Sequence, residues 1–568
     1  MIQPTCFWRN VLMRFCGLYL GVACLLAGFC FPAFAAKTWK NNMDGFWRDG
    51  TNWSGNIPPD STSYVQIDNT NTETITIDSL TDSTNLTVSK ITLSAPAGYT
   101  NTIYLNNVTN GPLTCTVGLE LLDGAFLRLT NSALLLTLTN DHVNIDGNLN
   151  LESGSINFGD TTVTARVGRV TSGTFTMNSG SVFAGAITVG GLTNSSGFIN
   201  MNGGIFNISS LFSIGRNLGT TGTVVVAGGQ LFASKINSRI GDSGIGQLII
   251  SNAGVVLTNV DIGRDALSAG TLNVQTGGVM TCLGNVALAR FAGALGSLFV
   301  TGGQFDASGR KISVGEEGSG QLILSSGVVQ AATLGVADDP TNTATGLLNV
   351  SGGSLNLSSN LFVGGVSNSS GQVSLGGGAI TVTNQSGTAN IIVANGNLTF
   401  NSGTLTTDRL FLTNGSGHFV FNGGTLVVRS TAVTNGLPFV VGNGVTPATL
   451  YLNGGTHAFA NGLVISSNAT LAGCGTILGT VTNRGTLAMT CGGSLVRPSI
   501  SSLVKTGVTN TLSFTSASNQ TYVLEYKNNL TDAIWTPIPP SLSGNGGVLK
   551  LLDTTATNAT RFYHVHTQ

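Results

Sequence analysis

Three aspartates between residues 242 and 265 are the side chains of this sequence best suited to chemistry. Asp242, Asp261 and Asp265 are accompanied by Arg264. Glycoside hydrolysis needs two carboxylates that converge on one bond, and a polysaccharide lyase needs a base with a cationic or metal neighbour. Asp242, Asp261 and Arg264 are therefore the candidate binding residues of a strip that would bind or cleave a polysaccharide.

The other reactive side chains form no recognisable constellation. Glu316 and Glu317 are adjacent, as are Asp338 and Asp339, so in strands the two members of each pair would point to opposite faces. The five His residues are scattered, which argues against a Ser-His-Asp triad. Cysteines beyond residue 35 lack metal-ligand spacing: Cys115, Cys282, Cys474 and Cys491. We expect no catalytic residue, no metal and no cofactor.

A repeat of 24 to 26 residues must position the candidate aspartates. Its shared pattern is G-x-[LVF]-x-[VIM]-x-G-G-x-[FLV], followed by a second apolar pair, an I-G step and a polar loop. Each unit contains three short strand signals with alternating apolar residues, and one unit cannot bury its apolar face alone. The repeats start at Gly173, Gly197, Gly222, Gly246, Gly270, Gly296, Gly320, Gly346 and Gly371.

The period of the repeat predicts the fold class: all-β, a parallel β-helix solenoid of about 25-residue coils. Three strands and three turns fill such a coil, whereas a propeller blade needs about 40 residues. Stacked coils repeat their turns, so we expect positive φ at the second glycine of the motif. That set comprises Gly204, Gly229, Gly254, Gly278, Gly303, Gly327 and Gly353.

Stacking also predicts how the rare charges meet. Aligned on the I-G step, the coils place Arg239 over Asp261 and Asp242 over Arg264. One interpretation is an exposed ladder of ion pairs, each contributing about 0–1 kcal/mol. The other is a binding strip or a catalytic row. The complementary signs favour the ladder.

The first 35 residues predict a secretory signal peptide. Arg9 and Arg14 precede the apolar run 15–31, and Ala33 and Ala35 form an A-x-A exit. An uncleaved membrane anchor is the alternative, and after cleavage we expect no integral membrane segment. The net charge of −1 gives no reason to expect a nucleic-acid partner. We therefore expect a protein that is secreted or located on the outer cell surface.

Four segments follow from these patterns: signal peptide 1–35, cap and first coils 36–150, repeat region 151–497, and a small C-terminal β-sandwich 498–568. Trp39, Trp47 and Trp53 cluster near the start of the mature chain, where a cap is favoured over a carbohydrate platform.

The aromatic residues of the C-terminal segment are either the core of the sandwich or a sugar-stacking surface, and the core is favoured. Trp535 is retained as a candidate binding residue. Cys474 and Cys491 form a disulfide or remain free, and the sequence leaves both options open.

The repeat hallmark, G-x-L-x-V-x-G-G followed by I-G, resembles the repeat of autotransporter passengers and of PEP-CTERM-associated proteins. The pattern Y-x-L-E-Y…W…R-F-Y-x-V near the C-terminus resembles a module of secreted proteins from Verrucomicrobia-like bacteria. About 70 residues follow the solenoid, too few for the passenger's membrane barrel, and the ending "RFYHVHTQ" lacks the sorting signal. Neither export route is therefore implied.

Together these observations predict a secreted or cell-surface structural or adhesive β-solenoid without catalytic activity. The alternative is a polysaccharide-binding or polysaccharide-cleaving β-helix. In either case the expected partner is an extracellular polysaccharide or a cell-surface glycan.

Overall fold

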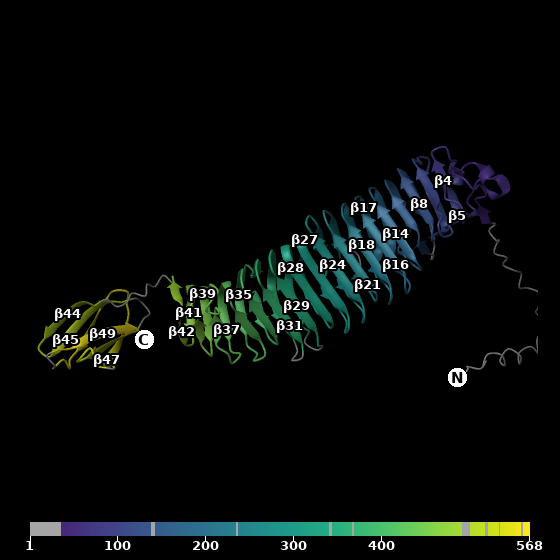
Figure 1. Cartoon of the computed structure of the whole chain (residues 1–568). Coiled ribbons are helices and arrows are strands. Elements are labelled where there is room, and N and C mark those ends of the chain that lie inside the picture. Colours follow the sequence, from purple (N-terminus) through teal and green to yellow (C-terminus); the bar gives the residue numbers. More distant parts are fainter. Residues whose placement is uncertain are drawn as a thin grey trace, which may run out of the picture.

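The main body of the protein is a long β-solenoid. In the computed structural model, 61% of residues are in strands and 2% in helices, and the solenoid has about 18 turns of roughly 24 residues (Figure 1). The predicted fold class is confirmed. At about 4.8 Å per coil, such a stack is roughly 85 Å long. The described residues are 36–137, 142–233, 237–339, 343–365, 369–490, 500–516, 521–532, 534–557 and 560–567. The predicted signal peptide lies outside them.

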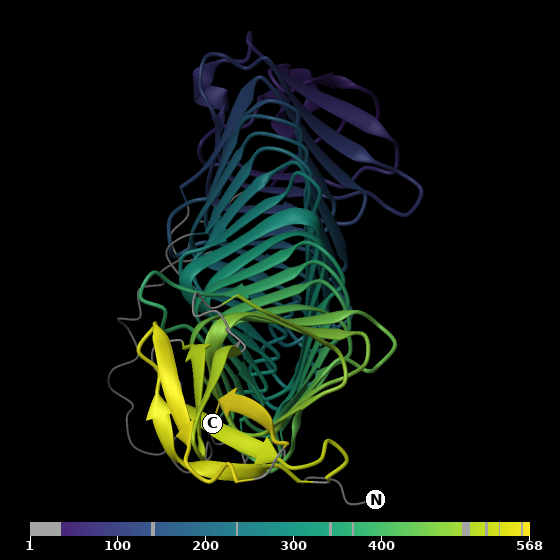
Figure 2. The ribbon, with the colours of Figure 1, turned by 90° about the vertical axis from the view of Figure 1, so that its left-hand side faces the viewer.

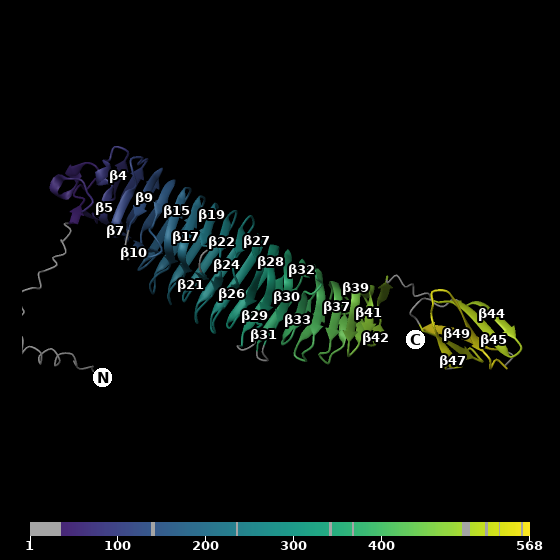
Figure 3. The same cartoon turned by 180° about the vertical axis from the view of Figure 1, so that it is seen from behind.

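Each coil consists of three short strands joined by turns. One central coil contains β21 (Ile245–Ile250), β22 (Gly254–Leu257) and β23 (Val260–Ile262). Each pairs in parallel with its counterpart in the next coil, which contains β24 (Ala269–Gln275), β25 (Val279–Cys282) and β26 (Val286–Leu288). Gly246 pairs with Gly270, and the other predicted repeat starts continue this register column. Seen from behind, the strands of successive coils follow one another along the rod (Figure 3).

The remaining strands of the solenoid follow the same order. Towards the N-terminus are β3 (Tyr64–Ile67), β4 (Glu73–Asp78), β5 (Thr87–Leu93), β6 (Asn101–Asn106), β7 (Leu113–Leu121), β8 (Ala125–Thr130), β9 (Ser132–Leu136), β10 (His142–Ile145), β11 (Asn148–Leu151) and β12 (Gly154–Asn157). The middle contains β13 (Thr164–Val167), β14 (Ser172–Met177), β15 (Ser181–Val189), β16 (Ser196–Met201), β17 (Ile205–Ile214), β18 (Thr221–Val226), β19 (Gln230–Ala233), β20 (Ser238–Ile240), β27 (Leu295–Val314), β28 (Ser319–Val336), β29 (Thr345–Val350) and β30 (Ser354–Val363). Towards the C-terminus are β31 (Ser370–Leu375), β32 (Ala379–Val382), β33 (Asn390–Val393), β34 (Gly396–Phe400), β35 (Thr404–Leu412), β36 (His418–Phe421), β37 (Gly424–Val433), β38 (Phe439–Val441), β39 (Ala448–Phe459), β40 (Leu463–Ile465), β41 (Ala469–Leu478), β42 (Val481–Asn483) and β43 (Thr486–Met489).

Alternation of apolar residues builds one core along the whole stack. Leu272 and Val274 of β24 are fully buried, as are Leu298 and Val300 at the matching positions of β27. Burial of each such side chain contributes about 1.5–3 kcal/mol. Viewed along the rod, the coils lie over one another and enclose this core (Figure 2). A single core cluster extends from Trp39 to Leu471.

The turn after the first strand of the coil follows the predicted glycine column only in part. Positive φ is confirmed at Gly204, Gly229, Gly327 and Gly353. It is wrong for Gly254, Gly278 and Gly303, where the left-handed residue is Asn252, Gly277 or Gly302 instead. At the first of these, Gly254 pairs with Gln230, the residue after Gly229, so it already belongs to the next strand. The second turn is one residue longer, because Val274 pairs with Ile250 but Val279 pairs with Gly254. In the third, Gln275 pairs with both Thr301 and Gly302, so a bulge shifts the turn.

A second left-handed column follows the third strand, at the glycine of the I-G step. Gly241, Gly263 and Gly315 have φ values of 73°, 70° and 71°. Alanines occupy the same position in two coils, with φ of 55° at Ala289 and 50° at Ala337. Glycine is favoured here for a steric reason as well, because a Cβ on Gly263 would lie 1.9 Å from the carbonyl oxygen of Leu295.

Buried tryptophans pack together at the N-terminal end of the solenoid. Here β1 (Ala36–Thr38) and β2 (Gly45–Phe46) pair with β3 and β4, near the short helices η1 (Gly50–Asn52), η2 (Ser54–Asn56) and η3 (Ser83–Asn85). The ring of Trp53 packs edge-on at 4.9 Å against both Trp39 and Trp47. All three side chains are at most 2% exposed, so they are core residues and not an exposed carbohydrate platform.

The C-terminal segment is the predicted small β-sandwich. One antiparallel sheet contains β44 (Ile500–Thr506), β45 (Thr509–Thr515) and β48 (Val548–Asp553), and the other contains β46 (Thr521–Lys527), β47 (Thr536–Ser543) and β49 (Phe562–Thr567). The two sheets share one core, to which Leu512, Phe514, Tyr522 and Leu524 contribute. The preference for a core role is thus confirmed for Tyr522.

The cysteines of the described residues are either buried or disulfide-bonded. Cys115 and Cys282 are free and buried, and burial raises the pKa of both thiols. Cys474 is disulfide-bonded, while Cys491, the partner considered from the sequence, lies outside the described residues. No helix in the described part of the chain is long and apolar enough to cross a bilayer.

Candidate functional site

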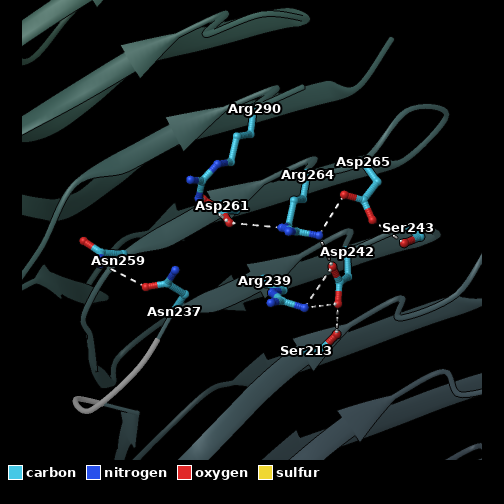
Figure 4. A network of polar contacts seen from close by, with 10 residues as sticks. All are labelled: Ser213, Asn237, Arg239, Asp242, Ser243, Asn259, Asp261, Arg264, Asp265 and Arg290. Carbon is cyan, nitrogen blue, oxygen red and sulfur yellow. Dashed lines mark hydrogen bonds and ion pairs between the residues drawn. The ribbon is translucent and has the colours of Figure 1, made fainter. Parts of the chain in front are cut away.

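The candidate residues lie where the third strand of successive coils runs into the following turn. Arg239 of β20 pairs in register with Asp261 of β23, as the alignment of the coils predicts. Asp242 and Arg264 follow left-handed glycines, and the amide N–H of Arg264 donates to the carbonyl of Gly241 at 2.9 Å. Four charged side chains from two adjacent coils therefore meet on one face of the rod (Figure 4).

Asp242 is held by two arginines and a serine. Its Oδ2 lies 3.0 Å from Nη1 of Arg239, and its Oδ1 lies 3.5 Å from Nη1 of Arg264 in the next coil. The hydroxyl of Ser213, one coil before, donates to Oδ2 at 3.0 Å. A single carboxylate thus links three consecutive coils.

Asp261 is held by the arginines that follow it in the chain. Nη1 of Arg290 lies 2.8 Å from Oδ1 and 3.0 Å from Oδ2, and Nε of Arg264 lies 3.7 Å from Oδ2. Arg239, its register neighbour, pairs with Asp242 instead. Arg239 therefore does not pair with the aspartate that faces it in register, and backbone register alone does not predict these ion pairs.

The expectation of an exposed ladder is wrong. Asp242 is 4% exposed and Asp261 is 2% exposed. The side chains of their arginine partners are partly exposed to solvent and shield the carboxylates from it. Because the carboxylates are buried and paired, loss of one partner leaves an uncompensated charge, which costs more than a break in a surface pair.

The outer layer of this network is more accessible. Asp265 accepts from Nη1 of Arg264 at 2.8 Å and from the hydroxyl of Ser243 at 2.7 Å. The guanidinium groups of Arg264 and Arg290 lie 5.4 Å and 5.5 Å from the ring centre of Phe291, within cation–π range. These contacts fix the arginine heads above the two buried aspartates.

Glu316 continues the column beyond Arg290. Burial raises the pKa of the Glu316 carboxyl, and the positive charges of Arg290 and Lys311 partly offset this effect. One coil further on, Lys311 pairs with Asp338 at 2.8 Å. The column thus continues with charges of both signs.

The arrangement is better suited to holding coils together than to proton transfer. A general base needs a carboxylate oxygen within hydrogen-bond reach of its substrate, whereas every carboxylate oxygen of Asp242 and Asp261 already contacts a guanidinium group. Within the described ranges, no group of three His, Cys, Asp or Glu residues is placed to hold a metal ion.

Trp535 lies apart from this network, in the C-terminal sandwich, and it is half-buried. Its ring centre is 5.3 Å from the His564 ring and 5.0 Å from the ammonium group of Lys527. It does not belong to the sandwich core, which distinguishes it from Tyr522. Trp535 remains the aromatic candidate for contact with a sugar ring.

Sequence reasoning missed a pocket of about 300 Å³ on the same face, lined by Arg166, Arg169 and Arg216. Arg216 follows the left-handed Gly215 and so belongs to the same column as Asp242. The available signal was Gly191, which interrupts that column between Arg169 and Arg216 and leaves space there.

Comparisons with known proteins found no match to this chain among family models, curated proteins or solved structures.

Proposed function

We propose that this chain is a secreted or cell-surface structural and adhesive protein that works as a stiff rod without catalysis. The observation that carries the proposal is the stack of about 18 turns around one core. Each internal coil is hydrogen-bonded to both of its neighbours, so the rod keeps its two ends apart. The signal-like pattern of the first 35 residues supports an extracellular site of action.

The charge network supports the mechanical part of the proposal. Asp242 connects three coils and Asp261 connects two through its arginine partners. Such links resist the separation of coils along the axis.

The half-buried Trp535 supports the adhesive part, because one end of the chain presents an aromatic ring beside a cation. Rings in this setting stack on sugars or on other apolar surfaces.

The test is retention of the protein on a panel of immobilised polysaccharides, combined with an assay for released oligosaccharide. We expect retention without product. Trp535→Ala should reduce retention several-fold, whereas Tyr451→Ala should not. Tyr451 is a suitable control because it is a 41% exposed aromatic on the rod.

A product that wild type releases and a folded Asp261→Asn variant does not would favour the polysaccharide-cleaving alternative. Lack of retention on every polysaccharide would contradict the adhesive part of the proposal and leave the rod itself unaffected.

A further inference from the structure

The arginine pocket owes its existence to a gap in the charged column. Arg169, Gly191 and Arg216 follow the left-handed glycines of three successive coils. The amide N–H of Gly191 donates to the carbonyl of Gly168, and that of Arg216 to the carbonyl of Gly190, which shows the equivalence of the positions. Two arginines thus stand two coils apart, about 10 Å, with no side chain between them.

The neighbouring coils show what normally fills this position. Further along the column, Asp242 lies next to Arg264, and opposite charges neutralise each other. At the pocket, two positive charges face a glycine. No carboxylate among the described residues forms an ion pair with Arg169 or Arg216, in contrast to Arg239, Arg264 and Arg290.

A buried carboxylate of the preceding coil binds the backbone of the turn and not an arginine side chain of the pocket. Asp146 is 4% exposed and accepts hydrogen bonds from the backbone N–H groups of Arg169, Val170 and Thr171. It stabilises the turn that carries Arg169, and its accepting oxygen is already occupied.

The floor of the pocket contains a hydroxyl without a partner. Thr188 lines the pocket and lies between Arg166 and Ser213 in one register column. Its side chain is 1% exposed, and its Oγ1 has no hydrogen-bond partner. An unpaired buried hydroxyl is destabilising, so a ligand that accepts its hydrogen bond would recover that loss.

We propose that this pocket binds an oxyanion, the sulfate or carboxylate group of an acidic polysaccharide or the free inorganic anion. Guanidinium forks match the oxygens of such groups in a bidentate manner, and the Thr188 hydroxyl supplies one more donor. The volume of about 300 Å³ is at the lower end of small-molecule sites. The proposal does not depend on the adhesive function, because it concerns a different region from Trp535.

Calorimetry on the full chain tests the proposal with inorganic sulfate, a sulfated dextran, polygalacturonate and neutral dextran. We expect wild type to bind sulfate and not neutral dextran. The double variant Arg169→Gln/Arg216→Gln should weaken binding roughly tenfold or more, because charge-assisted hydrogen bonds are lost. The matched control is Arg310→Gln, an exposed arginine outside the pocket, which should change the Kd less than twofold.

A second variant keeps every arginine. Gly191→Asp should place a carboxylate in the gap, as Asp242 does further along, and should abolish anion binding without lowering the melting temperature by more than a few degrees. Its Cβ would lie 3.0 Å from the Cα of Arg169, so a small local shift suffices.

The measurements with sulfated dextran and polygalacturonate identify the source of the anion. Tighter binding of a charged polymer than of free sulfate indicates the polysaccharide, and equal binding indicates the free anion. The proposal is overturned if wild type binds no anion, or if the double variant and Gly191→Asp bind as wild type does.

Discussion

At the level of single residues, the two buried aspartates have a structural role because arginines pair with both of them. Asp242 and Asp261 lie inside a shell of arginines, so their carboxylates are both desolvated and compensated. The sequence predicts that opposite charges meet, because the alignment of coils follows from the repeat. It does not predict burial or pairing out of register, because these depend on how far each arginine reaches across the turn.

Asp261→Asn should therefore destabilise the rod. The variant removes charge-assisted bonds to Arg290 and Arg264 and should cost about 1.5–3 kcal/mol in the free energy of unfolding. Asp265→Asn is the matched control, because Asp265 pairs with the same Arg264 but its side chain is 36% exposed, and it should cost less than about 1 kcal/mol. Urea denaturation measures both variants, and equal losses would speak against the buried network.

Glu73 gives the N-terminal end of the rod a pH dependence. Burial raises the pKa of this carboxyl to about 7, Asp44 adds to the effect, and the side chains of Asn69 and Trp39 only partly offset it. Between the unfolded pKa of about 4.5 and the folded value, the folded state binds more protons, so stability falls as the pH rises.

The loss across this window should reach up to roughly 3 kcal/mol. Glu73→Gln should remove the slope and be the more stable form at pH 8. Unfolding followed by tryptophan fluorescence at pH 5 and pH 8 measures this effect, and a wild type with the same stability at both values would contradict it.

At the level of the strands and turns, the sequence predicts the coils well and the exact residue at the left-handed position of a turn less well. The coil length, the strand order and the in-register pairing of Gly246 with Gly270 follow from glycine spacing and apolar alternation. The left-handed residue is misplaced at three positions: Gly254 is the first residue of the next strand, the turn at Gly278 has one extra residue, and a bulge shifts the turn at Gly303. The arginine pocket was missed because it arises from an absent side chain at Gly191 and an unpaired hydroxyl at Thr188.

The second left-handed column yields a prediction with an internal control. Gly263→Ala and Gly309→Ala both place a Cβ at positive φ, 70° and 74°, which costs about 1–2 kcal/mol. Only the first meets an obstacle, since its Cβ would lie 1.9 Å from the Leu295 oxygen, whereas nothing lies within 4 Å of the second. We expect Gly263→Ala to lower the melting temperature clearly more than Gly309→Ala. Similar losses would mean that the coils are not packed as closely as described.

Along the whole molecule, equivalent residues of successive coils are stacked in register at a constant rise. Thr223, Gln321 and Gln372 belong to one such column, in which each residue pairs with its counterpart one coil away. A rise of about 4.8 Å per coil fixes the distances within this column. The rod shape, the charge network and the arginine pocket all follow from it.

Spin labels at pairs of these positions measure this stacking directly by electron paramagnetic resonance. Thr223 and Gln321 are four coils apart, and Thr223 and Gln372 are six coils apart. Labels introduced as cysteines at each pair should therefore give distances near 19 Å and near 29 Å, about 4.8 Å per coil. Cys115 and Cys282 are buried and Cys474 is disulfide-bonded, so these native cysteines should not take up label. Distances that do not increase in proportion to the number of coils would contradict the solenoid.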